Sequence, residues 1–125
     1  PNRVALLAAV MEKMIGMHLM SYDIFMNVAG GVKVTEPAVD MAIVAAVASS
    51  FLDKSISDST VVLGEIGLTG EVRAIGQADT RIAESQKMGF SRVLLPKSNL
   101  QRLPDIDGIE IEGVRTVSEV VEKLF

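Results

Sequence analysis

The sequence contains no cysteine and only one histidine, His18. Without cysteine the chain forms neither disulfides nor thiolate metal sites, and one imidazole does not build a histidine metal site alone. His18 lies near the end of an expected helix, where we interpret it as a structural or surface residue. We therefore predict that this chain binds no metal and no cofactor.

Positive charge and aromatic side chains are also scarce. The sequence contains 12 Lys and Arg residues and 16 Asp and Glu residues, which gives a net charge of −4. Aromatic residues make up 4% of the sequence. Domains that bind phosphate backbones on their own are usually basic, and those that hold single strands stack bases on aromatic rings. The composition therefore argues against a stand-alone DNA-binding domain, although it leaves a local basic patch open.

No apolar run is long enough to cross a membrane. The run Val4–Met11 is interrupted by Glu12 and Lys13, whereas a span needs about 20 apolar residues. A helix that is apolar on all sides is usually buried, so we expect Arg3–Ile15 to form a core helix or a subunit contact. The sequence begins with Pro1 rather than Met, and we expect it to be a piece of a longer protein.

Apolar residues are abundant, at 49% of the 125 residues, which is enough for one domain with its own core over residues 1–125. The patterns predict four helices and about six short strands in mixed order, which is typical of an α/β or α+β fold. The expected helices are Arg3–Ile15, Thr35–Leu52, Ala78–Met88 and one that follows Thr116. The expected strands are Tyr22–Val28, Val32–Val34, Val61–Ile66, Val72–Ile75, Val93–Leu95 and Ile109–Ile111.

The stretch from Gly64 to Gly89 predicts a β-hairpin followed by an amphipathic helix. Gly70 lies where a hairpin turn needs a residue with positive φ. Gly89 is placed as the left-handed residue that ends the helix. One face of that helix is expected to carry Ala78, Ile82, Ser85 and Met88, which lie about one turn apart.

The residues alone do not assemble a catalytic motif. The phosphate-binding pattern G-x-x-x-x-G-K-[ST] and the dinucleotide pattern G-x-G-x-x-G are both absent. Asp40 is the one charged residue inside its expected helix, and we interpret it as a solvated or locally paired carboxylate. The pattern thus predicts an α/β domain without an assembled active site.

Several segments together resemble a known family. Gly64–Arg73, which reads GEIGLTGEVR, is similar to the C-terminal domain of Lon-type ATP-dependent proteases. Asn27–Pro37, which reads NVAGGVKVTEP, resembles more particularly the Lon-like domain of the bacterial RadA (Sms) family. Arg81–Ser85, Lys87–Phe90 and Leu95–Pro96 match as well. The resemblance covers essentially the whole chain and implies a Lon-like fold, a mixed sheet packed with about four helices.

The resemblance also identifies two altered positions. Lon-type peptidases use a serine in a Gly-Pro-Ser-Ala-Gly run as nucleophile and a lysine as its base. Glu36–Asp40 lies on that run and places Ala38 at the serine position, while Arg81 falls at the lysine position. Alanine offers no nucleophile, and a guanidinium stays protonated at neutral pH. The resemblance therefore implies a pseudo-protease with no catalytic residues.

The resemblance implies a role in a larger assembly. The expected function is a non-catalytic scaffold or oligomerisation domain of a RadA-like DNA repair and recombination ATPase in the bacterial cytoplasm. The expected partners are further copies of the chain in a hexameric ring, and single-stranded or branched DNA through the full-length protein, with no membrane. The ATPase motifs belong to the parent protein and are not assigned to this chain.

Three cations are candidates for direct DNA contact, namely Lys33, Arg73 and Arg81. The alternative for each is a solvated surface cation or a local ion pair. Two other functions also remain open: a working Lon-like Ser-Lys peptidase with a relocated nucleophile, and a protein-interaction domain outside DNA repair.

Overall fold

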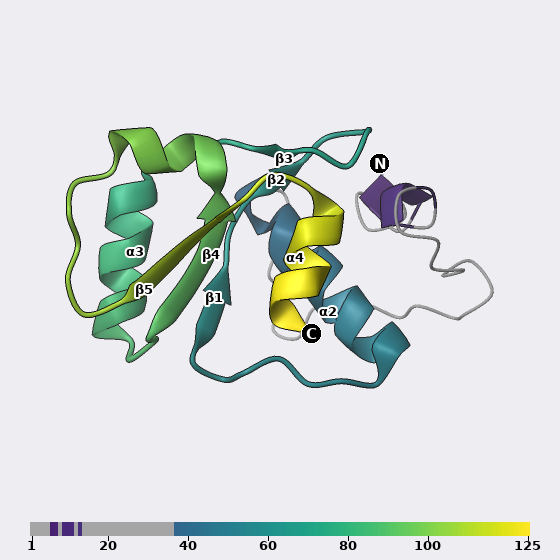
Figure 1. The fold of residues 1–125 in the computed structure, drawn as a ribbon, viewed down its shortest axis with the longest axis horizontal. Coiled ribbons are helices and arrows are strands. Elements are labelled where there is room, and N and C mark those ends of the chain that lie inside the picture. Colours follow the sequence, from purple (N-terminus) through teal and green to yellow (C-terminus); the bar gives the residue numbers. More distant parts are fainter. Residues whose placement is uncertain (1–5, 8, 12, 14–36) are drawn as a thin grey trace.

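A three-stranded parallel sheet lies between helices in the part of the chain that the structure describes (Figure 1). The structure is a computed structural model that describes residues 6, 7, 9–11, 13 and 37–125. It confirms the predicted α/β fold class. The strands expected at Tyr22–Val28 and Val32–Val34 lie outside the described residues, as do His18 and Lys33.

The central strand of this sheet is buried on both faces. The strands β1 (Thr60–Val62), β4 (Arg92–Pro96) and β5 (Glu110–Val114) are parallel, in the order β1-β4-β5. Val93, Leu94 and Leu95 of β4 are fully shielded from solvent. A covered parallel strand needs apolar residues on both faces, which explains why this run does not alternate with polar residues.

Helices cover both faces of the sheet, and each face has its own cluster of buried apolar residues. Leu94 packs in the cluster formed with α2 (Asp40–Leu52) and α4 (Val117–Leu124). Its neighbours Val93 and Leu95 point to the other face and pack in the cluster of α3 (Ala78–Lys87). In Figure 1, α3 accordingly lies on one side of the strands and α2 with α4 on the other.

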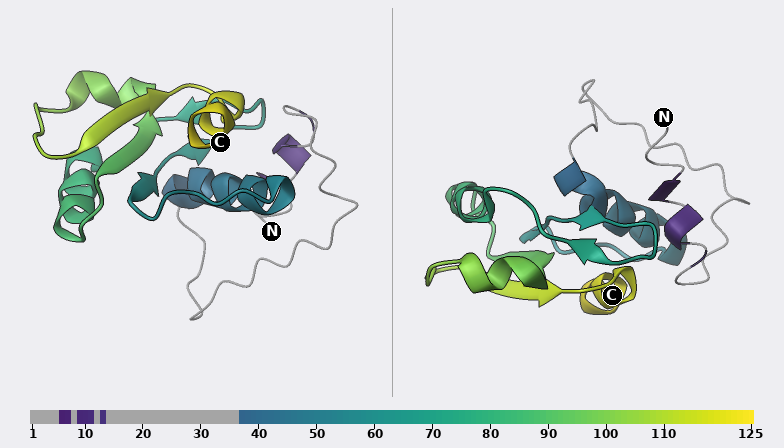
Figure 2. Two further views of the ribbon diagram at one scale, coloured as in Figure 1. Left: turned by 60° about the horizontal axis from the view of Figure 1, so that its bottom comes forward. Right: turned by 90° about the horizontal axis from the view of Figure 1, so that it is seen from above.

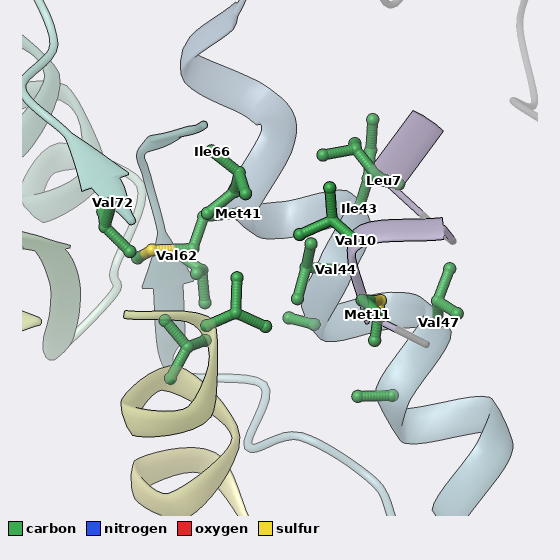
Figure 3. Packing of buried hydrophobic residues seen from close by; sticks show 14 of the residues in the cluster. Leu7, Val10, Met11, Met41, Ile43, Val44, Val47, Val62, Ile66 and Val72 are labelled. Atoms are coloured by element: carbon green, nitrogen blue, oxygen red, sulfur yellow. The ribbon is translucent and has the colours of Figure 1, made fainter. Parts of the chain in front are cut away.

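The apolar N-terminal run contributes to the larger core. The described residues of the expected first helix, 6, 7, 9–11 and 13, are helical. Among them, Leu7, Val10 and Met11 are buried and belong to the same cluster as Ile43 and Val44 of α2 (Figure 3). These side chains support the prediction of a core helix over this run. Within the described residues, no helix is both long and apolar enough to cross a membrane.

A small antiparallel hairpin stands apart from the parallel sheet. Its strands are β2 (Glu65–Ile66) and β3 (Val72–Arg73), and the view from above in Figure 2 places it between α2 and α4. The turn contains Gly70 with φ of 81°, as predicted. The hairpin is joined to the rest of the fold where Val72 N donates to the carbonyl of Arg115 at 2.7 Å.

The predicted strand Val61–Ile66 is wrong as one element, because the chain leaves the parallel sheet after Val62. Gly64 turns instead to the start of α2: its N–H donates to Ala38 O at 2.9 Å, and its carbonyl accepts from Met41 N at 3.0 Å. These bonds replace the ladder bonds of a continuing strand, since each backbone group must find a partner.

The predicted return strand Val72–Ile75 is also too long, since β3 ends at Arg73. Both backbone groups of Ile75 are hydrogen-bonded to Asn99, in the short 3₁₀ helix η4 (Lys97–Arg102). A side chain thus takes the place of a neighbouring strand.

Two predicted helix boundaries are confirmed, the end of α3 and the start of α4. Gly89 has φ of 94°, its N–H donates to Gln86 O at 3.1 Å, and Phe90 N donates to Ser85 O at 3.1 Å. These two bonds form the Schellman ending of α3. At the start of α4, the side chain of Thr116 accepts from Glu119 N at 3.2 Å, as expected of its capping sequence.

One residue of the predicted helix face points elsewhere. Ala78, Ile82 and Ser85 are buried, whereas Met88 is 76% exposed. With about 100° of rotation per residue, Met88 lies roughly 80° from the direction of Ala78, outside the stripe formed by Ala78, Ile82 and Ser85. The prediction that Met88 shares one face with the other three residues is therefore wrong.

Candidate functional site

Ala38 and Arg81, which are 43 positions apart in the sequence, line one open hollow of about 200 Å³. We call it the dyad hollow; the described residues that line it are Pro37, Ala38, Glu65, Ala74, Ile75, Gly76 and Arg81. The 3₁₀ turn η3 (Pro37–Val39) contributes Ala38, and α3 contributes Arg81. The structure thus brings together the two positions that the resemblance assigns to a nucleophile and a base.

The start of α2 holds Ala38 in place. In addition to the two bonds of Gly64, the carboxylate of Asp40 accepts a hydrogen bond from Ile66 N at 3.0 Å. Asp40 is completely buried. Of the two alternatives for Asp40, a solvated or a locally paired carboxylate, the solvated one is therefore wrong. A buried carboxylate requires hydrogen-bond donors, and the N–H of Ile66 is one of them.

Arg81 is fixed at the opposite side of the dyad hollow. Its Nε donates to the carbonyl of Gly76 at 2.9 Å, and its backbone N–H donates to Gln77 O at 3.0 Å. Gln77 has φ of 57°, a left-handed conformation that turns the chain into α3. The guanidinium therefore lies beside the corner between the hairpin and α3, where it donates hydrogen bonds and accepts none.

The chemistry of the dyad hollow differs from that of a serine peptidase. Its described lining contains one carboxylate, Glu65, and one guanidinium, and it contains no serine, threonine, cysteine, lysine or histidine. Acyl transfer through a Ser-Lys dyad needs a nucleophile and an amine that loses its proton. Neither group is present among these lining residues.

Arg73, another predicted DNA contact, lies on the hairpin and is paired. Its Nη2 lies 3.4 Å from Oε2 of Glu71. The Glu71 carboxylate also accepts from the hydroxyl of Thr69 at 2.8 Å, and this bond is the main reason that the pKa of Glu71 is lowered. Glu71 therefore compensates part of the charge of Arg73. The third candidate, Lys33, lies outside the described residues.

The sequence patterns missed a second group of cations. Lys97 and Arg115 line another open hollow, of about 270 Å³. We call it the strand-end hollow; its described lining is Val72, Lys97, Ser98, Gln101, Val114 and Arg115. The two cations are far apart in the sequence and belong to no motif. Only the register of β4 and β5 brings them together, and a sequence pattern does not specify that register.

Among the described residues, no group of three or more His, Cys, Asp or Glu side chains is arranged to hold a metal ion.

The fold and the dyad hollow agree with a match to a known family. The model for the Lon protease (S16) C-terminal proteolytic domain matches residues 6–125. The chain therefore belongs to this family, which confirms the resemblance seen in Gly64–Arg73.

Individual relatives are DNA repair proteins named RadA. The chain is 46% identical to the RadA of Streptococcus pyogenes serotype M3 (strain SSI-1) over 99% of its own length and 27% of that protein. It is 46% identical to the RadA of Bacillus subtilis (strain 168), over 96% of this chain and 26% of the relative. It is 41% identical to the RadA of Streptococcus pneumoniae (strain ATCC BAA-255 / R6), over 99% of this chain and 30% of that protein. The chain thus spans less than a third of the length of these relatives.

Proposed function

We propose that this chain is a non-catalytic scaffold and oligomerisation domain of a RadA-like DNA repair and recombination protein. The observation that carries the proposal is the dyad hollow, in which an alanine and an arginine occupy the two positions assigned to a peptidase dyad. The names of the relatives support the link to DNA repair. The proposed parent is a DNA-dependent ATPase of the bacterial cytoplasm, and this chain needs no cofactor for its role.

The proposed partner is a second copy of the chain, in a hexameric ring. The described surface carries large exposed apolar side chains, among them Leu68 at the tip of the hairpin. Such residues are common at contacts between subunits, where they lose their contact with water. In this proposal the exposed apolar side chains contact a neighbouring subunit, which requires no reactive group.

Direct DNA contact is the second part of the proposal, with Lys33, Arg73 and Arg81 as the candidates from the sequence. Arg73 is 55% exposed on its side chain, so it reaches solvent despite its pair with Glu71. The chain as a whole is acidic, and its grip on DNA is therefore expected to be local and sensitive to salt.

The experiment that tests the scaffold is the solution mass of the chain by light scattering over a range of concentrations, with and without single-stranded DNA. We expect a concentration-dependent rise from one chain of 13.4 kDa to six. A monomer at every concentration contradicts an assembly role for this domain.

The competing function, a Ser-Lys peptidase with a relocated nucleophile, is tested in the same samples with a fluorogenic peptide and a serine-reactive fluorophosphonate. We expect neither turnover nor labelling. Turnover that the fluorophosphonate blocks contradicts the non-catalytic assignment, whatever the mass of the particle.

A further inference from the structure

Lys97 and Arg115 each follow directly after a strand, at the same edge of the parallel sheet. In the register of β4 and β5, Pro96 is paired with Val114, and these are the last residues of the two strands. Lys97 and Arg115 are the next residues along each chain segment. Ligands of open parallel sheets bind outside the carboxyl ends of the strands, so this edge is a favoured place for a binding site.

The strand-end hollow has no negative charge of its own. None of its lining residues is acidic, and within the described residues no salt bridge joins Lys97 or Arg115 to a carboxylate. Glu71, which precedes the lining residue Val72, is turned to Thr69 and Arg73. Two positive charges therefore line one hollow with no salt-bridge partner among the described residues, in a chain whose net charge is negative.

Glu112 of β5 does not compensate the two cations either. The carboxylate of Glu112 lies 2.7 Å from the guanidinium of Arg92, and this pair holds the pKa of Glu112 below its usual value. Glu112 is therefore ionised at neutral pH and neutralises Arg92 rather than Arg115.

The backbone beneath both cations is held by the sheet. The carbonyl of Arg115 accepts from Val72 N at 2.7 Å, which ties it to the hairpin. On the other side, η4 lies so close to β5 that a Cβ on Gly113 would come within 3.0 Å of Lys97 Cα. The two side chains consequently project from a fixed backbone, which lowers part of the entropic cost of binding a ligand between them.

We propose that the strand-end hollow binds a phosphate group, with Lys97 and Arg115 supplying the charge. Arginine donates to two phosphate oxygens at once, and lysine adds a second, compact positive charge. The hydroxyl of Ser98 and the amide of Gln101 are the neutral donors in the lining. The phosphate comes either from a nucleic-acid backbone or from a free nucleotide. The choice of the first source rests on the proposed function, whereas the site itself does not.

Two ligands and two matched variants test this site in the 125-residue chain. The ligands are inorganic pyrophosphate and a single-stranded oligothymidylate. The test variant is Lys97→Gln with Arg115→Gln. The control variant is Lys87→Gln with Arg102→Gln, which removes the same charge from exposed positions outside the hollow. Circular dichroism checks that both variants fold.

We expect amide chemical shifts of Ser98, Gln101 and Arg115 to move when pyrophosphate is titrated into the natural chain. The test variant should bind pyrophosphate at least about tenfold more weakly, because a phosphate loses both of its charged partners. Its binding of oligothymidylate should lose about 1.4 from the slope of log K against log salt, at about 0.7 for each phosphate contact. The control variant should keep the pyrophosphate affinity of the natural chain.

The outcomes show separately whether the hollow binds phosphate and whether that phosphate comes from a nucleic acid or a free nucleotide. Neither answer depends on the proposed scaffold function. Binding of both ligands that is lost in the test variant supports a nucleic-acid source, and binding of pyrophosphate alone supports a free phosphate. Equal binding by the test and control variants, or no binding of either ligand to the natural chain, overturns the site. The solution mass tests the scaffold function separately, so a monomeric chain would not exclude phosphate binding in the hollow.

Discussion

The side-chain amide of Asn99 holds both backbone groups of Ile75: Oδ1 accepts from Ile75 N at 3.0 Å, and Nδ2 donates to Ile75 O at 2.9 Å. Ile75 lines the dyad hollow, and Asn99 belongs to η4, which supplies Lys97 and Ser98 to the strand-end hollow. One buried amide therefore connects the walls of the two candidate sites.

Replacing Asn99 by alanine should destabilise the fold by about 2–4 kcal/mol, because the N–H and C=O of Ile75 lose their partners in a part-buried place. The midpoint and slope of urea unfolding measure this change. Gln101→Ala, on the exposed side of the same η4, is the control and should change stability by less than about 0.5 kcal/mol. Equal effects of the two variants would show that the Asn99 bonds contribute little.

Gly113→Ala should also destabilise the protein, by about 1–3 kcal/mol, since the added methyl would lie 2.7 Å from Leu100 Cδ1 and 3.0 Å from Lys97 Cα. Backbone at Lys97 cannot yield as a flexible side chain does. The thermal midpoint measures the change. Gly76→Ala is the matched control, because no atom lies within 4 Å of a Cβ at that position. A control that is as unstable as the test variant would exclude the steric explanation.

Sequence patterns correctly predict those features that depend on one residue or on a short run of residues. The turn at Gly70, the helix end at Gly89 and the cap at Thr116 each depend on the conformation or side chain of one residue. The buried run of β4 was equally clear, because both faces of that strand are covered. Such features can therefore be predicted without any long-range contact.

Long-range contacts explain what the patterns missed. Val61–Ile66 looks like one strand, but Gly64 bonds to Ala38 and Met41 instead of continuing the ladder. Asp40 looks like a solvated charge, but Ile66 is brought to it from 26 positions away. The dyad positions became visible only through the family resemblance, while the strand-end hollow depends on a register that no pattern contains.

The turn of the hairpin should weaken in acid through Glu71. Its carboxylate accepts from Thr69, mainly from the hydroxyl, so its pKa in the folded chain lies below the ordinary 4.5. A depressed folded pKa means that the stabilisation is fully present above the unfolded pKa and is lost as pH falls through the folded pKa. NMR titration of the Thr69 amide should follow this loss below about pH 4.5.

The variant Glu71→Gln separates this contribution from the other carboxylates. It should be less stable than the natural chain at pH 7, and the difference should shrink as the pH falls below the folded pKa of Glu71. A stability difference that is constant between pH 7 and pH 2 would mean that ionisation of Glu71 does not support the turn.

Restoring a serine and a lysine in the dyad hollow should restore a reactive nucleophile. Ala38→Ser restores a hydroxyl and Arg81→Lys restores an amine, and both positions line the same hollow, whose other residues are apolar or glycine except for Glu65. Burial disfavours the charged form of a lysine there, whereas the Glu65 carboxylate favours it, and we expect burial to be the larger effect. The double variant should therefore react with a fluorophosphonate, whereas the natural chain should not.

The two single variants are the controls for this restoration. Ala38→Ser alone leaves its hydroxyl beside a guanidinium that cannot take the proton, and Arg81→Lys alone provides a base with no nucleophile. Mass spectrometry should locate the label on residue 38 of the double variant. A label on any other serine, or one that also occurs in the natural chain, would instead show a relocated nucleophile. An unlabelled double variant that still folds would mean that the hollow has lost more of the peptidase geometry than these two side chains.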